Sequence, residues 1–449
     1  MLRGSCGRLP NPRRRFTTGL LGLSGLLLLT SLAGAACTSD KAATLTPGES
    51  SPTIAPLAID PSLEAIDSLE EGLYILDLTS RQLTLIDPNG HAPRWSDDGE
   101  FFAYGASLAD TAAASELELG CAPQAPRYCG LAIQLMDSDS GETRELAVGE
   151  APSWMPGGHK LLFSQLNWNA DDDMGRGEIH LVDIDSDRES VLAEHSPGQL
   201  DQHPKWSFDA STVIYAFGGS VYRLASDGSG SPGVVTSGYP VAVSPVSNDI
   251  VIARSSDDSA PSSSLTGISV DAPADESAIS AGVIGDKPAN WSPDGRRVAY
   301  AHDSDPPSIG VWDWESGDNF NIDPAWYEPP VWFPDGTRFA YAVFHDAPSP
   351  DAWPNSEVFL SPADGSSAPL KLSDGWPLVW LPDGSGLIVR RRISGVGQET
   401  SPAIREEIAL VGLAGDVHTL VKSVPIICTG VAMSPDGTKL AISAHNCRE

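Results

Sequence analysis

Basic residues are scarce in this 449-residue chain, which has 28 Lys and Arg against 60 Asp and Glu and a formal net charge of −32. Five of the basic residues fall among the first 36 positions, a segment without any acidic residue. Removal of that segment would leave 23 basic and 60 acidic residues, a net charge of −37. Because nucleic acids attract positive surfaces and repel negative ones, we expect no nucleic-acid partner.

Two familiar catalytic motifs are also missing. No Gly-x-Ser-x-Gly nucleophile elbow follows the N-terminal leader, and no His-Glu-x-x-His zinc helix occurs anywhere. These absences exclude the common patterns of serine hydrolases and zinc proteases. They favour a binding function that needs no cofactor over an enzymatic one.

Long apolar runs are missing too, except for one near the start of the chain. Three arginines at 13–15 precede an apolar run from Gly19 to about Leu32, and small residues follow up to Ala36. This order of charged, apolar and small residues is typical of an export signal. This run has roughly 14 apolar residues, whereas a membrane-spanning helix needs about 20. We therefore assign residues 1–36 to a signal peptide.

Cys37 directly follows the small residues at the end of this signal. That arrangement resembles a bacterial lipoprotein signal, which implies that Cys37 is acylated and becomes the new N-terminus. Ordinary secretion after Ala36 is the alternative, and the export route, general or twin-arginine, stays open. Residues 37–69 are rich in Ser, Thr, Pro and Ala without a sustained apolar period, which indicates a flexible tether.

Apart from Cys6 in the signal and Cys37, only four cysteines remain, namely Cys121, Cys129, Cys428 and Cys447. An even number in an oxidising compartment favours disulfides over metal thiolates. Proximity in the sequence suggests pairing of Cys121 with Cys129 and of Cys428 with Cys447, although four cysteines allow three pairings.

Residues 70–449 repeat one phrase, in which an aromatic or apolar anchor precedes a turn of the Pro-Asp-Gly type. The eight anchors are Trp95, Trp154, Trp206, Val243, Trp291, Trp332, Trp380 and Met433, spaced by 37 to 59 residues. Pro, Asp and Gly in this order favour a tight hairpin turn. Repeats of about 40 to 50 residues are typical of β-propellers.

The segments after each turn, such as "RRVAYAH" and "TRFAYAVF", are apolar at consecutive positions, which indicates strands buried on both faces. A third and a more polar fourth strand then recur, as in "SIGVWDW" and "TRELAV". The sequence predicts an all-β propeller of eight four-stranded blades, or seven if the degenerate Val243 unit is not a blade. The chain begins on two outer strands (73–86) and ends on two inner ones (431–443), so their pairing would close the ring.

The phrase "PxWSPDGxxIAY" and the following strand resemble the TolB-type, WD-repeat-like propeller repeat of bacterial periplasmic proteins. The resemblance covers about Leu73 to His445 and is most specific at Trp291, Trp332 and Trp380. It implies a propeller in an extracytoplasmic compartment, and it concerns the repeat rather than a function. TolB itself carries an N-terminal α/β domain where this chain has its tether.

One acidic segment, "NWNADDDMGRGE", has the ligand spacing of an EF-hand-type calcium loop. Asn167, Asn169, Asp171 and Glu178 fall at loop positions one, three, five and twelve. Asp172 stands at position six, where the tight turn normally requires Gly, and a strand follows instead of a helix. A solvated acidic loop is the alternative to a calcium site.

These patterns predict an exported, lipid-anchored, monomeric propeller that binds an envelope protein or peptide without catalysis. The long excursions from Ala109 to Ala132 and from Ile393 to Glu406 would form its recognition surface. The alternative is an extracytoplasmic metal-dependent lyase or hydrolase acting on polysaccharide or peptide. Its metal would come from histidines expected along one rim, His203, His302, His345 and His445.

Overall fold

The computed structural model describes residues 63–107, 131–167, 176–195, 202–255, 262–284, 289–302, 307–322, 330–344, 356–392, 406–424 and 430–445. Contacts divide the chain into Met1–Pro52 and Thr53–Glu449, and every described residue belongs to the second unit. Residues 1–62, including Cys37, and the four cysteines predicted to form disulfides lie outside the described ranges. The described residues form strands, and no helix among them has the length and apolar character needed to cross a membrane.

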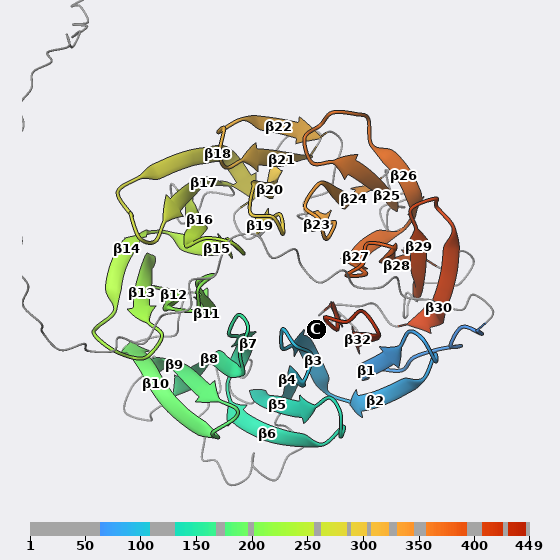
Figure 1. The fold of residues 1–449 in the computed structure, drawn as a ribbon, viewed down its shortest axis with the longest axis horizontal. Coiled ribbons are helices and arrows are strands. Elements are labelled where there is room, and N and C mark those ends of the chain that lie inside the picture. The colour runs from blue at the N-terminus through green and yellow to red at the C-terminus, as the bar shows by residue number, and fades with distance from the viewer. Residues whose placement is uncertain are drawn as a thin grey trace, which may run out of the picture. The chain divides into compact units, whose positions relative to one another are not determined.

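Eight antiparallel four-stranded sheets follow one another around a ring, which confirms the predicted eight-bladed β-propeller (Figure 1). Blades 1 to 4 comprise β3 (Gly90–Trp95), β4 (Phe101–Ser107), β5 (Leu131–Asp137) and β6 (Thr143–Val148); β7 (Glu150–Trp154), β8 (Lys160–Asn167), β9 (Arg176–Asp183) and β10 (Arg188–His195); β11 (Gln202–Trp206), β12 (Thr212–Phe217), β13 (Ser220–Ala225) and β14 (Gly233–Ser237); and β15 (Tyr239–Val243), β16 (Asp249–Ser255), β17 (Ser262–Ser269) and β18 (Glu276–Ile284). Blades 5 to 8 comprise β19 (Asn290–Trp291), β20 (Arg297–His302), β21 (Ser308–Asp313) and β22 (Asn319–Ile322); β23 (Val331–Trp332), β24 (Arg338–Phe344), β25 (Ser356–Pro362) and β26 (Leu370–Asp374); β27 (Trp376–Trp380), β28 (Gly386–Arg392), β29 (Glu406–Gly412) and β30 (Val417–Val424); and β31 (Val431–Met433), β32 (Lys439–Ala444), β1 (Gly72–Asp77) and β2 (Leu83–Asp87).

Blade 8 joins the two ends of the described chain. Its strand order is β2-β1-β32-β31, and β1 pairs with β32 in continuous antiparallel register from Gly72 opposite Ala444 to Asp77 opposite Lys439. The predicted closure of the ring is therefore confirmed. The degenerate Val243 unit is a true blade, because β15 to β18 form a complete sheet. A single residue pair, Val283 with His302, additionally links blade 4 to blade 5.

The apolar core consists of eight clusters, one at each interface between neighbouring blades. Successive residues of a second strand contribute to different interfaces. Leu161 of β8 packs toward blade 1, whereas the next residue, Leu162, packs toward blade 3, and both are 0% exposed. This confirms that the consecutive apolar positions in the sequence mark strands buried on both faces.

The recurring Ser-Pro-Asp-Gly phrase forms a hydrogen-bonded turn between the first and second strands of a blade. In blade 5 the Ser292 hydroxyl donates to Asp294 Oδ1 at 2.5 Å and accepts from the Arg297 amide at 2.9 Å. Asp294 Oδ1 also accepts from the Arg296 amide at 3.1 Å. Gly295 adopts a φ of 66°, a conformation that side chains disfavour. Equivalent Ser–Asp pairs occur in blades 1, 3 and 8.

The anchor tryptophans end the innermost strands, and five of them connect neighbouring blades through their indole N–H groups. We call this set the tryptophan belt. Four of these indole groups donate to backbone carbonyls of the preceding blade: Trp95 to Ala432, Trp154 to Arg94, Trp206 to Ser153 and Trp380 to Val331. The fifth, Trp332, donates to the Asn290 side chain, and all five distances are 3.0 to 3.3 Å. Each acceptor residue directly precedes the anchor of the preceding blade. Trp291 departs from the pattern, because its Nε1 atom is buried without a hydrogen-bond partner.

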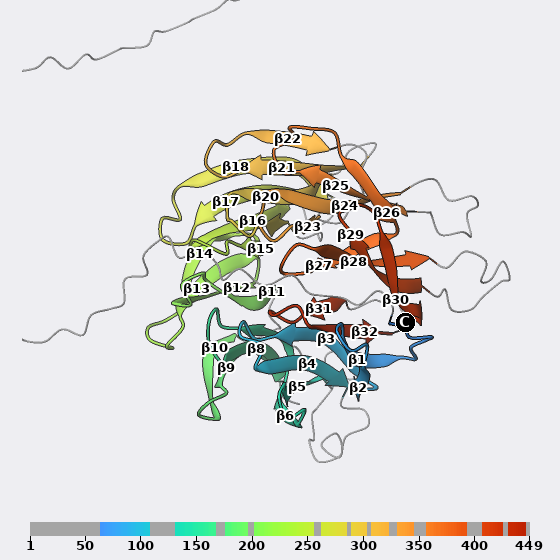
Figure 2. The same ribbon diagram turned by 45° about the vertical axis from the view of Figure 1, so that its right-hand side comes forward.

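Residues 63–69, which the sequence assigned to the tether, contact the outer strand of blade 7. Ile66 forms a parallel bridge with Val421 of β30, and the Leu69 amide donates to the Ser423 carbonyl at 2.8 Å. Leu69 is 1% exposed and belongs to the cluster between blades 7 and 8. These few residues cover the outer edge of blade 7 (Figure 2). The segment that packs against the blades therefore begins before residue 70.

Loss of a belt hydrogen bond should destabilise the ring. Trp206→Phe removes the donor to the Ser153 carbonyl, whereas Trp291→Phe removes an indole N–H that has no partner. Both side chains are similarly buried, at 5% and 8% exposed, so the loss of apolar contact is matched. We expect Trp206→Phe to lower the free energy of unfolding by about 1 kcal/mol more than Trp291→Phe in urea denaturation. Equal losses would contradict a stabilising role of the belt.

Candidate functional site

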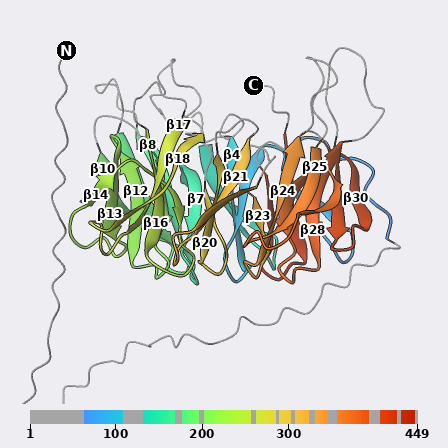
Figure 3. The same ribbon diagram turned by 90° about the horizontal axis from the view of Figure 1, so that it is seen from above.

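The ring has two faces that differ in the connections they carry. Every blade repeats the same antiparallel order. The turn between strands one and two and the turn between strands three and four therefore lie on the same side of the ring. We call this side the turn face. The connections between second and third strands, and those that enter the next blade, start and end on the opposite side, the loop face. In Figure 3 the strands run between these two faces.

The two excursions predicted to form the recognition surface begin and end on the loop face. Ser107 and Leu131 are register partners separated by 23 residues, and Arg392 and Glu406 are register partners separated by 13 residues. The excursions themselves lie outside the described residues. Their ends are held in place by paired strands of blades 1 and 7.

Two basic side chains, Arg94 and Lys205, occupy equivalent positions on the innermost strands β3 and β11. Burial lowers the pKa of Arg94, although its side chain keeps contact with solvent, because the neighbouring blades displace much of the surrounding water. Burial lowers the pKa of Lys205, and the positive charge of Arg94 lowers it further. The two charges therefore lie within electrostatic range of each other, although blade 2 separates their strands.

No carboxylate among the described residues forms an ion pair with Arg94 or Lys205. Arg94 instead donates to the Pro93 carbonyl at 2.8 Å. We call the two residues the axial basic pair. In a chain with a net charge of −32, an exposed arginine and a half-buried lysine without a counterion are a favourable place for an anionic group of a ligand.

The histidines expected along one rim do not form a metal-ligand group within the described ranges. His302 ends β20, and its Nδ1 atom is buried without a hydrogen-bond partner. His445 Nε2 lies 2.7 Å from the Gly90 carbonyl oxygen. His203 lies in β11, and only its backbone is described, whereas His345 lies outside the described residues.

The predicted calcium ligands are only partly described. Asn167 ends β8, and Asn169 and Asp171 lie outside the described residues. Glu178 lies in β9, is 9% exposed, and has its Oε2 atom 2.9 Å from His180 Nε2. The Nδ1 atom of His180 lies 2.6 Å from Glu189 Oε1. The Glu178 carboxylate is thus engaged inside blade 2, and the calcium site stays a prediction.

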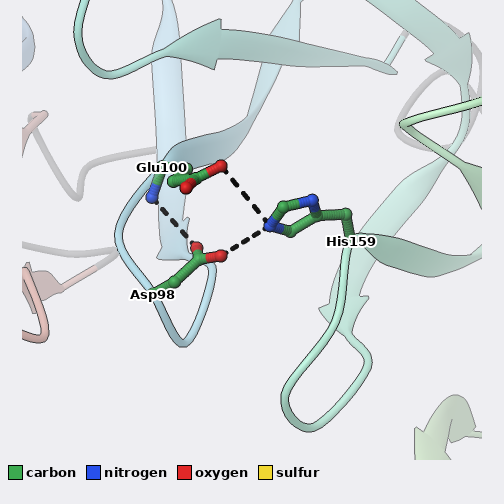
Figure 4. Close-up of side chains that lie close together, drawn as sticks. All are labelled: Asp98, Glu100 and His159. Carbon is green, nitrogen blue, oxygen red and sulfur yellow. Dashed lines mark hydrogen bonds and ion pairs between the residues drawn. The ribbon is translucent and has the colours of Figure 1, made fainter.

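The described residues contain one group of three side chains that could hold a metal ion, formed by Asp98, Glu100 and His159 (Figure 4). Asp98 and Glu100 lie on the β3–β4 turn of blade 1, and His159 lies on the β7–β8 turn of blade 2. His159 Nε2 lies 2.5 Å from Asp98 Oδ2 and 3.8 Å from Glu100 Oε2. The group therefore spans the interface between two blades on the turn face.

Neighbouring groups hold this site in place. Asp98 Oδ1 accepts hydrogen bonds from the Ser96 hydroxyl at 2.6 Å and from the Glu100 amide at 3.0 Å. The other ring nitrogen of His159, Nδ1, lies 2.9 Å from Asp185 Oδ1. The imidazole and the Phe101 ring pack in a T-shaped arrangement, with ring centroids 4.9 Å apart.

These contacts change the proton affinities of the group in opposite directions. Hydrogen bonds to Asp98 and to Asp185 raise the pKa of His159. Burial raises the pKa of Asp98, but hydrogen bonds from Ser96, His159 and the Glu100 amide outweigh it and bring that pKa to about 2. Without a metal ion, these contacts favour the protonated form of His159 and the ionised form of Asp98.

Sequence reasoning missed this group because its members lie about 60 residues apart in the chain. Glu100 and His159 each stand five positions after an anchor, Trp95 and Trp154. Equivalent turn positions of successive repeats lie side by side on the turn face, so an alignment of adjacent repeats could have brought the two residues together. The phrase in which Asp98 occurs was recognised only as a turn.

The bridge through His159 should give a pH-dependent contribution to stability. Because the folded pKa lies above the unfolded value of about 6.5, the contribution is fully present below that pH and is lost as the pH rises through the folded pKa. In calorimetry with a chelator present, the wild type should unfold at a higher temperature than His159→Gln at pH 6. The difference should shrink toward pH 9, and a constant or growing difference would contradict the bridge.

Comparisons with known proteins support the fold and assign no function. No family model and no curated protein matches the chain. Solved structures similar to this one include the following three. They are a putative TolB from Agrobacterium tumefaciens (20% identity, 60% of this chain and 98% of that chain, TM-score 0.35), a eukaryotic initiation factor (13%, 82% and 88%, 0.52) and an oligogalacturonate lyase from Vibrio parahaemolyticus (13%, 68% and 95%, 0.45). Of these three, only the initiation factor has a TM-score above 0.5, so this likeness supports the fold, and a fold does not by itself assign a function.

Proposed function

We propose that this chain is an exported propeller, anchored to a bacterial envelope membrane by a lipid on Cys37, that binds an envelope protein or peptide without catalysis. The observation that carries the proposal is the closed ring, whose loop face holds both ends of the long excursions after β4 and β28. Binding residues commonly lie on loops that a rigid scaffold supports. A scaffold that is already ordered also lowers the entropic cost of binding.

The charges of the ring favour a particular kind of ligand. The axial basic pair attracts a carboxylate, whereas the overall charge of −32 repels any partner that is negative along its whole length. A protein or peptide with a local acidic group satisfies both conditions. A polyanionic polysaccharide does not, so the charges argue against that substrate for the lyase alternative and leave neutral glycans and peptides as its substrates.

The proposal predicts specific partners in the envelope that depend on the axial basic pair. We would crosslink the full-length protein in cells, recover it from envelope membranes, and compare the wild type with Cys37→Ser and with Arg94→Ala combined with Lys205→Ala. The wild type should recover envelope proteins, and Cys37→Ser should shift from the membrane to the soluble fraction. Loss of the axial pair should weaken recovery at least about tenfold, because each lost charge contact typically costs more than 1.4 kcal/mol.

A control variant, Arg144→Ala combined with Lys371→Ala, removes the same charge from the outer strands β6 and β26. It should recover partners as the wild type does. If the wild type recovers no envelope protein, the scaffold proposal is wrong. Metal-dependent turnover of polysaccharide or peptide by the purified protein would then support the enzyme alternative.

A further inference from the structure

The group formed by Asp98, Glu100 and His159 has the composition of a transition-metal site. It offers one imidazole nitrogen and two carboxylate oxygens, all within 4.8 Å of one another. Zinc and similar ions bind such mixed sets, whereas calcium and magnesium prefer oxygen ligands alone. The imidazole therefore distinguishes this group from the many acidic clusters expected on a surface with 60 acidic residues.

The orientation of His159 is the second observation that points to a metal. Metal-binding histidines usually donate their other ring N–H to a carboxylate, which fixes the ring and directs the free nitrogen at the ion. His159 makes this contact through Nδ1 to Asp185 Oδ1 at 2.9 Å. The Ile184 amide also donates to the His159 carbonyl at 2.9 Å, which fixes the backbone at this position. Nε2 is thus held facing Asp98 and Glu100.

The distances within the group suit an ion after small side-chain movements. Zinc–ligand bonds of about 2.0 to 2.2 Å place the donor atoms of a tetrahedral site about 3.3 Å apart. The two distances from Nε2, 2.5 Å to Asp98 and 3.8 Å to Glu100, lie on either side of that value. The two carboxylates can adjust, because their side chains are 44% and 65% exposed, whereas the ring is 20% exposed.

The arrangement is specific to one interface among those described. Asp209 has the same turn contacts in blade 3, with Ser207 and the Ser211 amide, but its other oxygen faces the Asn248 amide at 3.3 Å. An amide nitrogen cannot bind a metal as an imidazole nitrogen does. The turn geometry alone therefore does not create the donor group.

We propose that Asp98, Glu100 and His159 bind one divalent transition-metal ion, of the zinc type, across the interface of blades 1 and 2. Asp185 orients the ring through its contact with Nδ1 of His159. Three protein ligands leave a fourth coordination position open toward solvent. The site lies on the turn face, opposite the predicted recognition excursions, and its test does not depend on the proposed scaffold function.

The test measures metal binding and needs no knowledge of a partner. Full-length protein without a histidine tag is stripped with a chelator and titrated with Zn²⁺ by calorimetry, and with Co²⁺ by visible absorption. The wild type should bind one ion more than His159→Gln, and Zn²⁺ should raise only the wild-type unfolding temperature. Glu100→Gln should weaken Zn²⁺ binding at least about tenfold, since even outer ligand partners contribute that much.

Two variants separate the site from general effects on folding. Glu100→Gln changes an exposed side chain and leaves the His159–Asp98 contact in place, so it should fold like the wild type. Asp209→Asn disturbs the matching turn of blade 3 and should keep the full Zn²⁺ stoichiometry. The proposal is overturned if the wild type binds no Zn²⁺ below millimolar concentration, or if His159→Gln and Glu100→Gln bind it as the wild type does.

Discussion

Closure of the ring is the constraint on which the rest of this structure depends. Each blade buries its two apolar faces only against its neighbours, so an open ring would leave two faces and one seam exposed to water. The pairing of β1 with β32 removes that seam by building blade 8 from both ends of the described chain. Residues 63–69 also protect an exposed strand, because they cover part of the outer edge of blade 7.

The repeated phrase made much of this fold predictable, because its chemistry is local. Pro, Asp and Gly specify the turn, and consecutive apolar residues mark strands with two buried faces, so blade number and closure followed from counting repeats. The contacts of Leu69 were missed, since they join residues about 350 positions apart. The group around His159 was missed for a related reason: it needs two turns from successive blades, and neither turn is unusual alone.

The two faces of the ring separate two kinds of chemistry. The loop face carries the ends of the long excursions, whereas the axial basic pair lies on the innermost strands, directly before the anchors that lead into the turns. The turn face carries aspartates in hydrogen-bonded turns. At the interface of blades 1 and 2 one of them, Asp98, contacts His159, whose other ring nitrogen contacts Asp185. The strands separate the excursion ends on the loop face from the group around His159 on the turn face.

Hydrogen exchange of the full-length protein, read by mass spectrometry, tests the closure most directly. If the chain ends close the ring, peptides from β1 and β32 should exchange as slowly as those from β12 in blade 3, because all three belong to one cooperative unit. If β1 exchanges many-fold faster than β12, the seam opens independently of the other blades. That result would contradict a ring whose stability depends on the pairing of its two ends.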